Sequence, residues 1–167
     1  MPSTHRDIRF REVQRMASGW RTLCAGLALG AWLAGGYMLW LGLSGAAPFE
    51  PLLIAIIILI GGIIVPMVTI FAALKTEVRD DTLHVMWWPL KRRTHTLDEI
   101  ESAVAVTYRP LLEYGGWGIR WSPLSGWAYN ISGNRGVRLR FKNGQRLLIG
   151  SKHPEALVSA LGLPALS

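Results

Sequence analysis

Two long runs of apolar residues dominate the first half of the chain. Thr22 to Leu43 and Leu52 to Leu74 contain no charged residue. Each is close to the ~20 residues that a helix needs to cross a hydrocarbon core of about 30 Å. Two such runs in succession are poorly explained as core helices, and the first is too long for a cleaved signal peptide. The pattern predicts a transmembrane helical hairpin in residues 20–74, with spans at about 20–43 and 52–74.

After Leu74 the pattern changes to short alternating runs separated by turn residues, which is typical of β-strands. We expect seven or so strands, followed by a terminal helix in HPEALVSALG, with Pro154 in its first turn and Gly162 just past its end. The fold class predicted is therefore an α+β membrane protein. An N-terminal transmembrane hairpin precedes a small antiparallel β-barrel or sandwich, which the C-terminal helix caps.

One turn in this region is specified by the pattern of apolar and basic residues. Apolar and basic side chains alternate along Val137–Phe141. A three-residue loop at 142–144 places Leu147 and Ile149 on the apolar face, whereas a two-residue turn places them on the basic face. We therefore predict the three-residue loop, with Gly144 at positive φ.

Composition and charge support a membrane protein with one cytoplasmic domain. The chain is 50% hydrophobic and 17% charged, with a mean hydropathy of +0.27 and a net charge of +7, whereas a soluble domain has roughly 25% charged residues. Lys and Arg flank both runs but are absent from the loop Ser44–Pro51. Because segments rich in Lys and Arg next to a membrane span stay in the cytoplasm, we expect both termini there. The predicted parts are a cytoplasmic flank at 1–19, the hairpin, and a cytoplasmic domain at 75–167.

The flank itself has two interpretations. Arginines are mixed with apolar residues from Ile8 to Trp20, which fits an amphipathic helix on the inner leaflet. Ile8 and Phe10 also alternate with arginines, which fits a strand. The sequence leaves this choice open.

Small residues in the two runs indicate how the helices pack. Gly26 and Gly30 form a small-xxx-small pattern, for which Gly61 and Gly62 of the second run are the expected partners. Contact with the helices of another protein is the alternative. Neither run contains Asp, Glu, Lys, Arg or His, which argues against a transporter or a channel.

An aromatic-rich segment at 113–134 is the first candidate site. For most of it we favour a structural role, in which three glycines between 115 and 118 allow a tight corner. The functional interpretation is a groove for a ligand or a protein, lined by Tyr114, Trp117 and Trp127 with Arg120 as its charged group. The segment lacks the spacing of a phosphate-binding loop. Nucleic-acid binding is disfavoured because the domain is tethered to a membrane.

Basic residues form the second candidate site, for lipid headgroups. Its members are Arg138, Arg140, Lys142, Arg146, Lys91, Arg92 and Arg93. The simpler explanation of these charges is the positive-inside topology. We expect no catalytic residues, no metal site and no cofactor. The histidines are scattered, and the only cysteine, Cys24, lies inside the first run.

Five segments carry a resemblance to a known family: FREVQRM, EVRDDTLHV, LLEYGGWGIR, GWAYNISGNRGVRLRF and LLIGSKHPEAL. The chain resembles small bacterial two-span membrane proteins with a C-terminal pleckstrin-homology-like (PH-like) domain, a family of unknown function. The resemblance covers nearly the whole chain. It implies two orthogonally packed antiparallel sheets, a helix closing one end, and location in the bacterial inner membrane. It implies no activity, because a fold alone does not give function.

The leading hypothesis for function is a non-enzymatic accessory or scaffolding subunit of a membrane complex. Its partners would be membrane lipids and another membrane protein or a second copy of the chain, and not nucleic acid. The alternative is a module that binds anionic lipid, and a small membrane enzyme is a distant third. A lipid module loses binding as the salt concentration rises. An aromatic protein interface is instead sensitive to replacement of its tryptophans.

Overall fold

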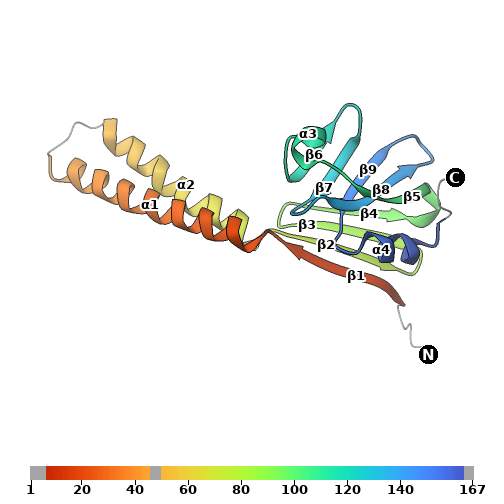
Figure 1. Ribbon diagram of the computed structural model, residues 1–167. Helices are drawn as coiled ribbons and strands as arrows, with labels where there is room; N and C mark the ends of the chain where they lie inside the picture. The colour runs from red at the N-terminus through yellow and green to blue at the C-terminus, as the bar shows by residue number, and fades with distance from the viewer. Residues whose placement is uncertain (1–6, 46–49, 164–167) are drawn as a thin grey trace. The chain divides into compact units, whose positions relative to one another are not determined.

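The computed structural model describes residues 7–45 and 50–163, and it divides into two compact units (Figure 1). The helical unit is Met16–Phe71, and the β unit is the described part of Met1–Arg15 together with that of Ala72–Ser167. Three parts of the predictions lie outside the described residues. They are residues 1–6 of the flank, 46–49 of the loop and 164–167 of the C-terminal domain.

The helical unit consists of α1 (Ser18–Leu43) and α2 (Glu50–Phe71), which pack against each other. Both helices are long and apolar enough to cross a membrane. The second apolar run was predicted to end at Leu74, but α2 ends at Phe71 and Leu74 is fully buried in a strand. Composition does not separate an apolar residue that ends a membrane span from one that begins a buried strand.

Close approach of the two helices occurs at Gly35 and Gly62. A methyl group built on Gly35 would lie 3.1 Å from Leu59 Cγ, and one on Gly62 would lie 2.6 Å from Trp32 Cδ1. The other three predicted packing glycines, Gly26, Gly30 and Gly61, have nothing within 4 Å of that position. The predicted pairing is corrected accordingly. At 3.6 residues per turn, Gly26 and Gly30 are rotated by about 180° and 140° from Gly35 around α1, away from α2.

Sheet 1 of the β unit has four antiparallel strands in the order β1-β2-β3-β4. The strands are β1 (Ile8–Arg15), β2 (Ala73–Arg79), β3 (Thr82–Trp88) and β4 (Lys91–Thr96). The N-terminal flank is therefore a strand over Ile8–Arg15, and the amphipathic-helix interpretation is wrong for these residues. Gln14 fixes β1 to the rest of the unit, because its buried Nε2 donates a hydrogen bond to the Gly150 carbonyl at 2.8 Å.

Sheet 2 has five strands in the order β5-β8-β9-β7-β6. Its elements are β5 (Ile100–Thr107), β6 (Gly118–Ser122), β7 (Gly126–Asn130), β8 (Arg135–Phe141) and β9 (Arg146–Gly150), with the one-turn helices η1 (Leu97–Glu99) and α3 (Pro110–Tyr114) in the connections. Its ladders are antiparallel except that between β7 and β9, which is parallel. This corrects the expectation of a purely antiparallel sheet. The segment between β7 and β8 carries the chain past β9, so that β9 returns beside β7 in the same direction.

The β8–β9 turn has the predicted register. The Phe141 N–H donates to the Gln145 carbonyl at 2.9 Å, and Gly144 has a φ of 82°. The three-residue loop is confirmed. As a result Leu139, Leu147 and Ile149 are buried on the same face of sheet 2, between the two sheets.

The predicted terminal helix is also present, as α4 (Pro154–Leu161), and it ends at Gly162 with a φ of 63°. Leu157 and Leu161 are buried. The helix contacts β1 and β2 of sheet 1 as well as β5 and β8 of sheet 2. It therefore closes one end of the apolar space between the sheets.

Candidate functional site

One end of sheet 1 carries both connections to the helices. β1 ends at Arg15 just before α1, and β2 begins at Ala73 just after α2. These two residues are paired in the sheet, and Ala73 is also paired with Trp88 at the end of β3. The β3–β4 turn follows directly. We call the set Arg15, Ala73 and Trp88–Leu90 the joined end of the β unit.

β4 is an edge strand, and it lies beside the hairpins of sheet 2. Among the described residues it pairs only with β3. A hollow of about 110 Å³ lies between β4 and sheet 2. Its lining includes Arg93, His95, Trp127, Phe141, Gln145 and Arg146. Two larger open hollows adjoin it and share Gln145, one along the β6–β7 hairpin and one beside η1. We call this continuous depression the β4 groove.

The groove combines aromatic surface with positive charge. The Lys91 ammonium lies 5.2 Å from the centroid of the Trp127 ring, within the range of a cation–π contact. The His95 ring lies 4.7 Å from that of Phe141. Burial lowers the pKa of His95, and this outweighs the opposing effect of Glu99, so the imidazole is mostly neutral at pH 7. The positive charge of the groove therefore comes from Lys91, Arg93, Lys142 and Arg146, and the acidic residues Asp98 and Glu99 line the same hollow as Lys142.

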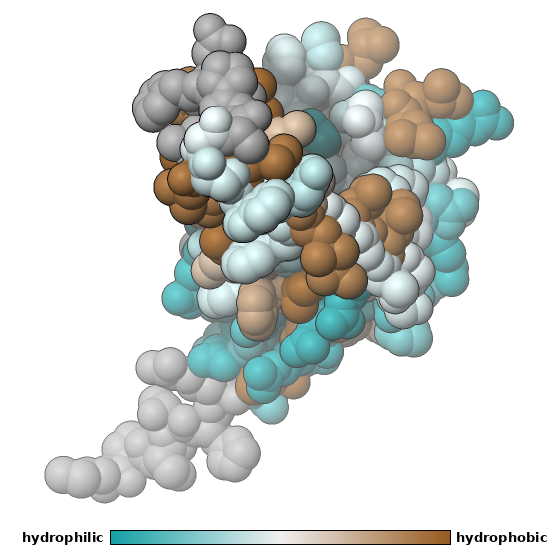
Figure 2. All heavy atoms as spheres, turned by 90° about the vertical axis from the view of Figure 1, so that its left-hand side faces the viewer, coloured by the Kyte–Doolittle hydropathy of each residue, from teal (hydrophilic) through white to brown (hydrophobic). Residues whose placement is uncertain are grey.

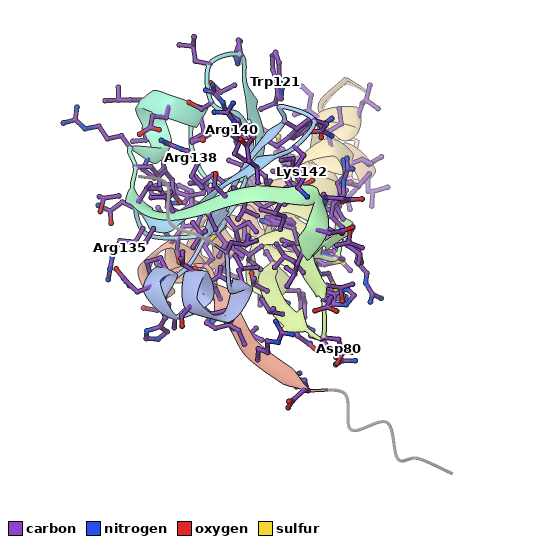
Figure 3. All side chains as sticks on the ribbon, turned by 90° about the vertical axis from the view of Figure 1, so that its right-hand side faces the viewer. Asp80, Trp121, Arg135, Arg138, Arg140 and Lys142 are labelled. Carbon is purple, nitrogen blue, oxygen red and sulfur yellow. The ribbon has the colours of Figure 1, made fainter. Side chains whose placement is uncertain are left out.

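The predicted headgroup residues do not form one patch. Arg138 and Arg140 lie on the outer face of β8, where Glu113 and Glu101 approach their guanidinium groups at 3.1 and 2.9 Å (Figure 3). Lys142 lies in the β8–β9 turn and lines the hollow of the groove beside η1. Lys91, Arg93 and Arg146 belong to the groove, whereas Arg92 lies on the outer face of sheet 1. Only part of the predicted set is thus available to one ligand.

The four residues of the predicted partner groove are not brought together either. Tyr114 is buried against Tyr108, Ala128 and Leu148 beneath α3. Trp127 is separated from Arg120 by strand alternation, because Arg120 pairs with Ala128 and Trp127 therefore points to the opposite face of β7. Arg120 and Trp117 remain neighbours.

Local hydrogen bonds fix the corner that precedes β6. The Trp117 indole donates to the Gly133 carbonyl at 2.9 Å, and Arg120 Nε donates to the Trp117 carbonyl at 3.2 Å. Gly115, Gly116 and Gly118 all have positive φ. The tight corner that these glycines predicted is therefore present.

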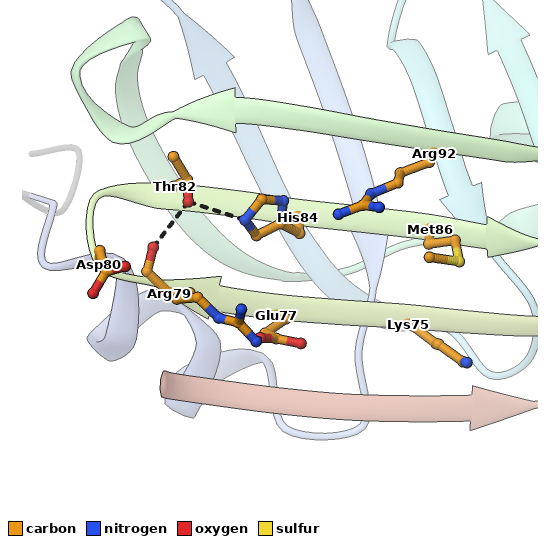
Figure 4. Close-up of a pocket in the computed structure, with 8 residues that line it drawn as sticks. All are labelled: Lys75, Glu77, Arg79, Asp80, Thr82, His84, Met86 and Arg92. Atoms are coloured by element: carbon orange, nitrogen blue, oxygen red, sulfur yellow. Dashed lines mark hydrogen bonds and ion pairs between the residues drawn. The ribbon is translucent and has the colours of Figure 1, made fainter. Parts of the chain in front are cut away.

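A separate polar hollow of about 330 Å³ lies on the outer face of sheet 1 (Figure 4). Its side chains mainly bind one another. Glu77 is paired with Arg79, and Thr82 donates to the Arg79 carbonyl at 2.9 Å and contacts His84 at 3.0 Å. We assign this hollow no role in binding.

Sequence reasoning missed the β4 groove, although a signal was present. The β4 sequence KRRTHT contains no apolar residue on either face. A strand that is polar on both faces is typical of the edge of a sheet. His95 and Gln145 were missed because their surroundings come from strands distant in the sequence.

Within residues 7–45 and 50–163, no group of three or more His, Cys, Asp or Glu side chains is placed to hold a metal ion. Comparison of the chain with protein-family models, with curated proteins and with solved structures finds no match.

Proposed function

We propose that this chain is a two-span protein of the bacterial cytoplasmic membrane and a non-catalytic accessory or scaffolding subunit. Its β unit, a PH-like domain, binds a protein partner on the cytoplasmic side. The pairing of Arg15 with Ala73 supports the topology, because β1 and β2 flank the hairpin in sequence and yet share one sheet. The strand before the hairpin and the strand after it must then lie on the same side of the membrane. Two crossings of the membrane, one by each helix, return the chain to that side. The arginines of β1 favour the cytoplasmic side.

The observation that carries partner binding is the open edge of β4 beside the groove. An edge strand presents unpaired backbone groups to which an extended segment of another protein can add as a further strand. Alternate side chains of that segment would enter the hollow between β4 and sheet 2, which offers aromatic rings and arginines. The complementary partner is an extended segment in which every second side chain, on the face that enters the hollow, is acidic or apolar.

A second candidate function is binding of anionic lipid headgroups by the same groove. It is favoured by the position of Lys91, which follows the joined end directly and so lies near the two connections to the helices. Basic residues near an anionic surface contribute about 1 kcal/mol each. The ion pairs of Arg138 and Arg140 argue against these two residues as the headgroup site.

Site-specific photo-crosslinking in native membranes tests the proposal. Gln145 is replaced by benzoylphenylalanine, because it is exposed and lines all three hollows of the groove. Lys75, exposed on the outer face of sheet 1, is the matched control position. We expect one protein adduct of defined mass from position 145 and none from position 75. Lipid adducts alone at position 145 would favour the second candidate, and identical adducts at both positions would contradict a groove-specific partner.

A further inference from the structure

The free edge of β4 presents the backbone groups of alternate residues. Leu97, the residue after β4, donates its N–H to the Asp81 carbonyl at 2.9 Å, so its backbone faces the β3 side. Backbone direction alternates along a strand, and the odd-numbered residues of β4 therefore bind β3. Arg92 and Thr94 turn their N–H and C=O groups to the free edge instead. Both residues are exposed, so an added strand can reach these groups.

The side chains of β4 divide between two faces in the same alternation. Those that point into the groove are Lys91, Arg93 and His95. Arg92 points to the outer face of sheet 1 (Figure 4), and Thr94 does the same, because its hydroxyl contacts the His84 ring at 3.0 Å. A strand added to β4 would therefore form its hydrogen bonds opposite Arg92 and Thr94. The side chains that it turns into the groove would lie opposite the three odd-numbered residues.

The charge of the groove differs between its two ends. The end beside the β3–β4 turn is basic, and its residues are Lys91, Arg93 and Arg146. The hollow beside η1 is instead lined by two acidic residues and one lysine, namely Asp98, Glu99 and Lys142. Between the two ends, the centroid of the mostly neutral His95 ring lies 4.7 Å from that of Phe141. The groove therefore offers an apolar centre with a basic side and an acidic side.

Exposed apolar side chains are not what distinguishes this edge. Figure 2 shows brown apolar side chains among teal and white polar ones on the side of the molecule that it faces, and single exposed apolar residues need no partner. The β4 edge is distinguished by free backbone groups and by the order of charge along its groove face. Backbone hydrogen bonds supply affinity for an added strand, and complementary charges supply specificity.

We propose that β4 binds its partner segment in the antiparallel direction and in the order apolar-x-acidic-x-acidic from N- to C-terminus, where x is any residue. This inference rests on the partner strand of the proposed function and adds its direction and charge order. The apolar residue would lie opposite His95 and against Phe141, and the two acidic residues would lie opposite Arg93 and Lys91. Antiparallel ladders are slightly more stable than parallel ones, and the ladders of sheet 1 are already antiparallel.

The charge order also fixes the register of the added strand. Backbone hydrogen bonds alone would not do so, because their pattern repeats every two residues. A shift of the segment by two residues towards η1 would move a carboxylate opposite His95, into the hollow that Asp98 and Glu99 line. It would also leave Lys91 without an acidic residue opposite. Like charges that face each other across strands are destabilising, so the shifted register is disfavoured.

Crosslinking from both ends of the groove in native membranes tests the direction. Benzoylphenylalanine replaces either Leu90, which is 66% exposed and precedes Lys91, or Lys142, which lines the η1 end. Mass spectrometry identifies the partner residue attached to each. We expect the residue attached at position 142 to precede that attached at position 90 by about six residues, because opposed antiparallel strands advance residue for residue. The segment between them should read apolar-x-acidic-x-acidic.

Charge variants test the charge order through the yield of the protein adduct from position 145. Arg93→Glu should lower this yield several-fold, because it places like charges opposite each other. Lys75→Glu, on the outer face of sheet 1, is the matched control and should leave the yield unchanged.

The outcomes separate this inference from the proposed function. The reverse order of the two attached residues would overturn the antiparallel direction and leave the protein partner in place. A segment without the two acidic residues, or a yield that survives Arg93→Glu, would overturn the charge order alone. Lipid adducts only, or no adduct, at positions 90, 142 and 145 would overturn the protein partner and this inference together.

Discussion

The hydrogen bond between Gln14 and Gly150 gives the sharpest test of β1 as a structural strand. Gln14 is 2% exposed, and it is the residue before the last of β1. Gln14→Ala removes the 2.8 Å bond and leaves the buried Gly150 carbonyl without this donor. An unsatisfied buried group costs about 1–3 kcal/mol, so we expect the free energy of unfolding of the β unit to fall by about 2 kcal/mol. At about 4 °C per kcal/mol, the melting temperature should fall by ~8 °C.

The assay is thermal unfolding of the full-length protein in detergent micelles, followed by near-ultraviolet circular dichroism. Val13→Ala is the matched control, because Val13 precedes Gln14 but faces outwards and is 45% exposed. Its effect should stay within about 0.5 kcal/mol. Equal melting temperatures for Gln14→Ala and Val13→Ala would refute the packing of β1 against β9.

Three other predictions follow from the packing and the electrostatics. Gly62→Ala should loosen the helical hairpin, because its methyl group would lie 2.6 Å from Trp32 Cδ1, whereas the methyl group of Gly61→Ala meets nothing within 4 Å. The yield of a cysteine crosslink between the two helices, measured in micelles, compares the two variants, and equal yields would contradict the packing. Gly126→Ala should lower the melting temperature more than Gly133→Ala, since both glycines have positive φ but only at Gly126 would the methyl group collide with the Arg146 carbonyl. Burial raises the pKa of Tyr108 to about 12, so the unfolded chain loses this proton first and stability should fall as the pH rises from about 10 to 12. Tyr108→Phe should flatten that part of the pH profile, and an unchanged profile would show that Tyr108 does not control it.

The sequence predicts those features that depend on local periodicity. The apolar runs predict α1 and α2, and alternation predicts the three-residue β8–β9 loop, because a shift by one residue would place Leu147 and Ile149 on the basic face. Pro154 and Gly162 mark the ends of α4. The five-residue α3 was missed because a segment of one turn, PLLEY, has too few positions to show a period.

Features that depend on contacts distant in sequence were not predicted. The parallel pairing of β7 with β9 and the burial of Tyr114 require knowledge of which strands become neighbours. The predicted aromatic groove failed for the same reason, because its members were grouped by proximity in sequence while strand alternation separates Trp127 from Arg120. For the helices, the glycine pattern identified Gly62 but not the face of α1 that it meets.

The direct pairing of Arg15 with Ala73 has a consequence for biosynthesis. The two helices occupy the place that a tight turn has in an ordinary β-hairpin, so the first strand leaves the ribosome long before its neighbour exists. β1 must remain unpaired while the whole helical hairpin is synthesised. Its arginines, spaced along the strand, would discourage pairing with other chains during this delay. The entropic cost of closing a loop grows only by about 0.6 kcal/mol with each doubling of its length, so one sheet can hold two helices between adjacent strands.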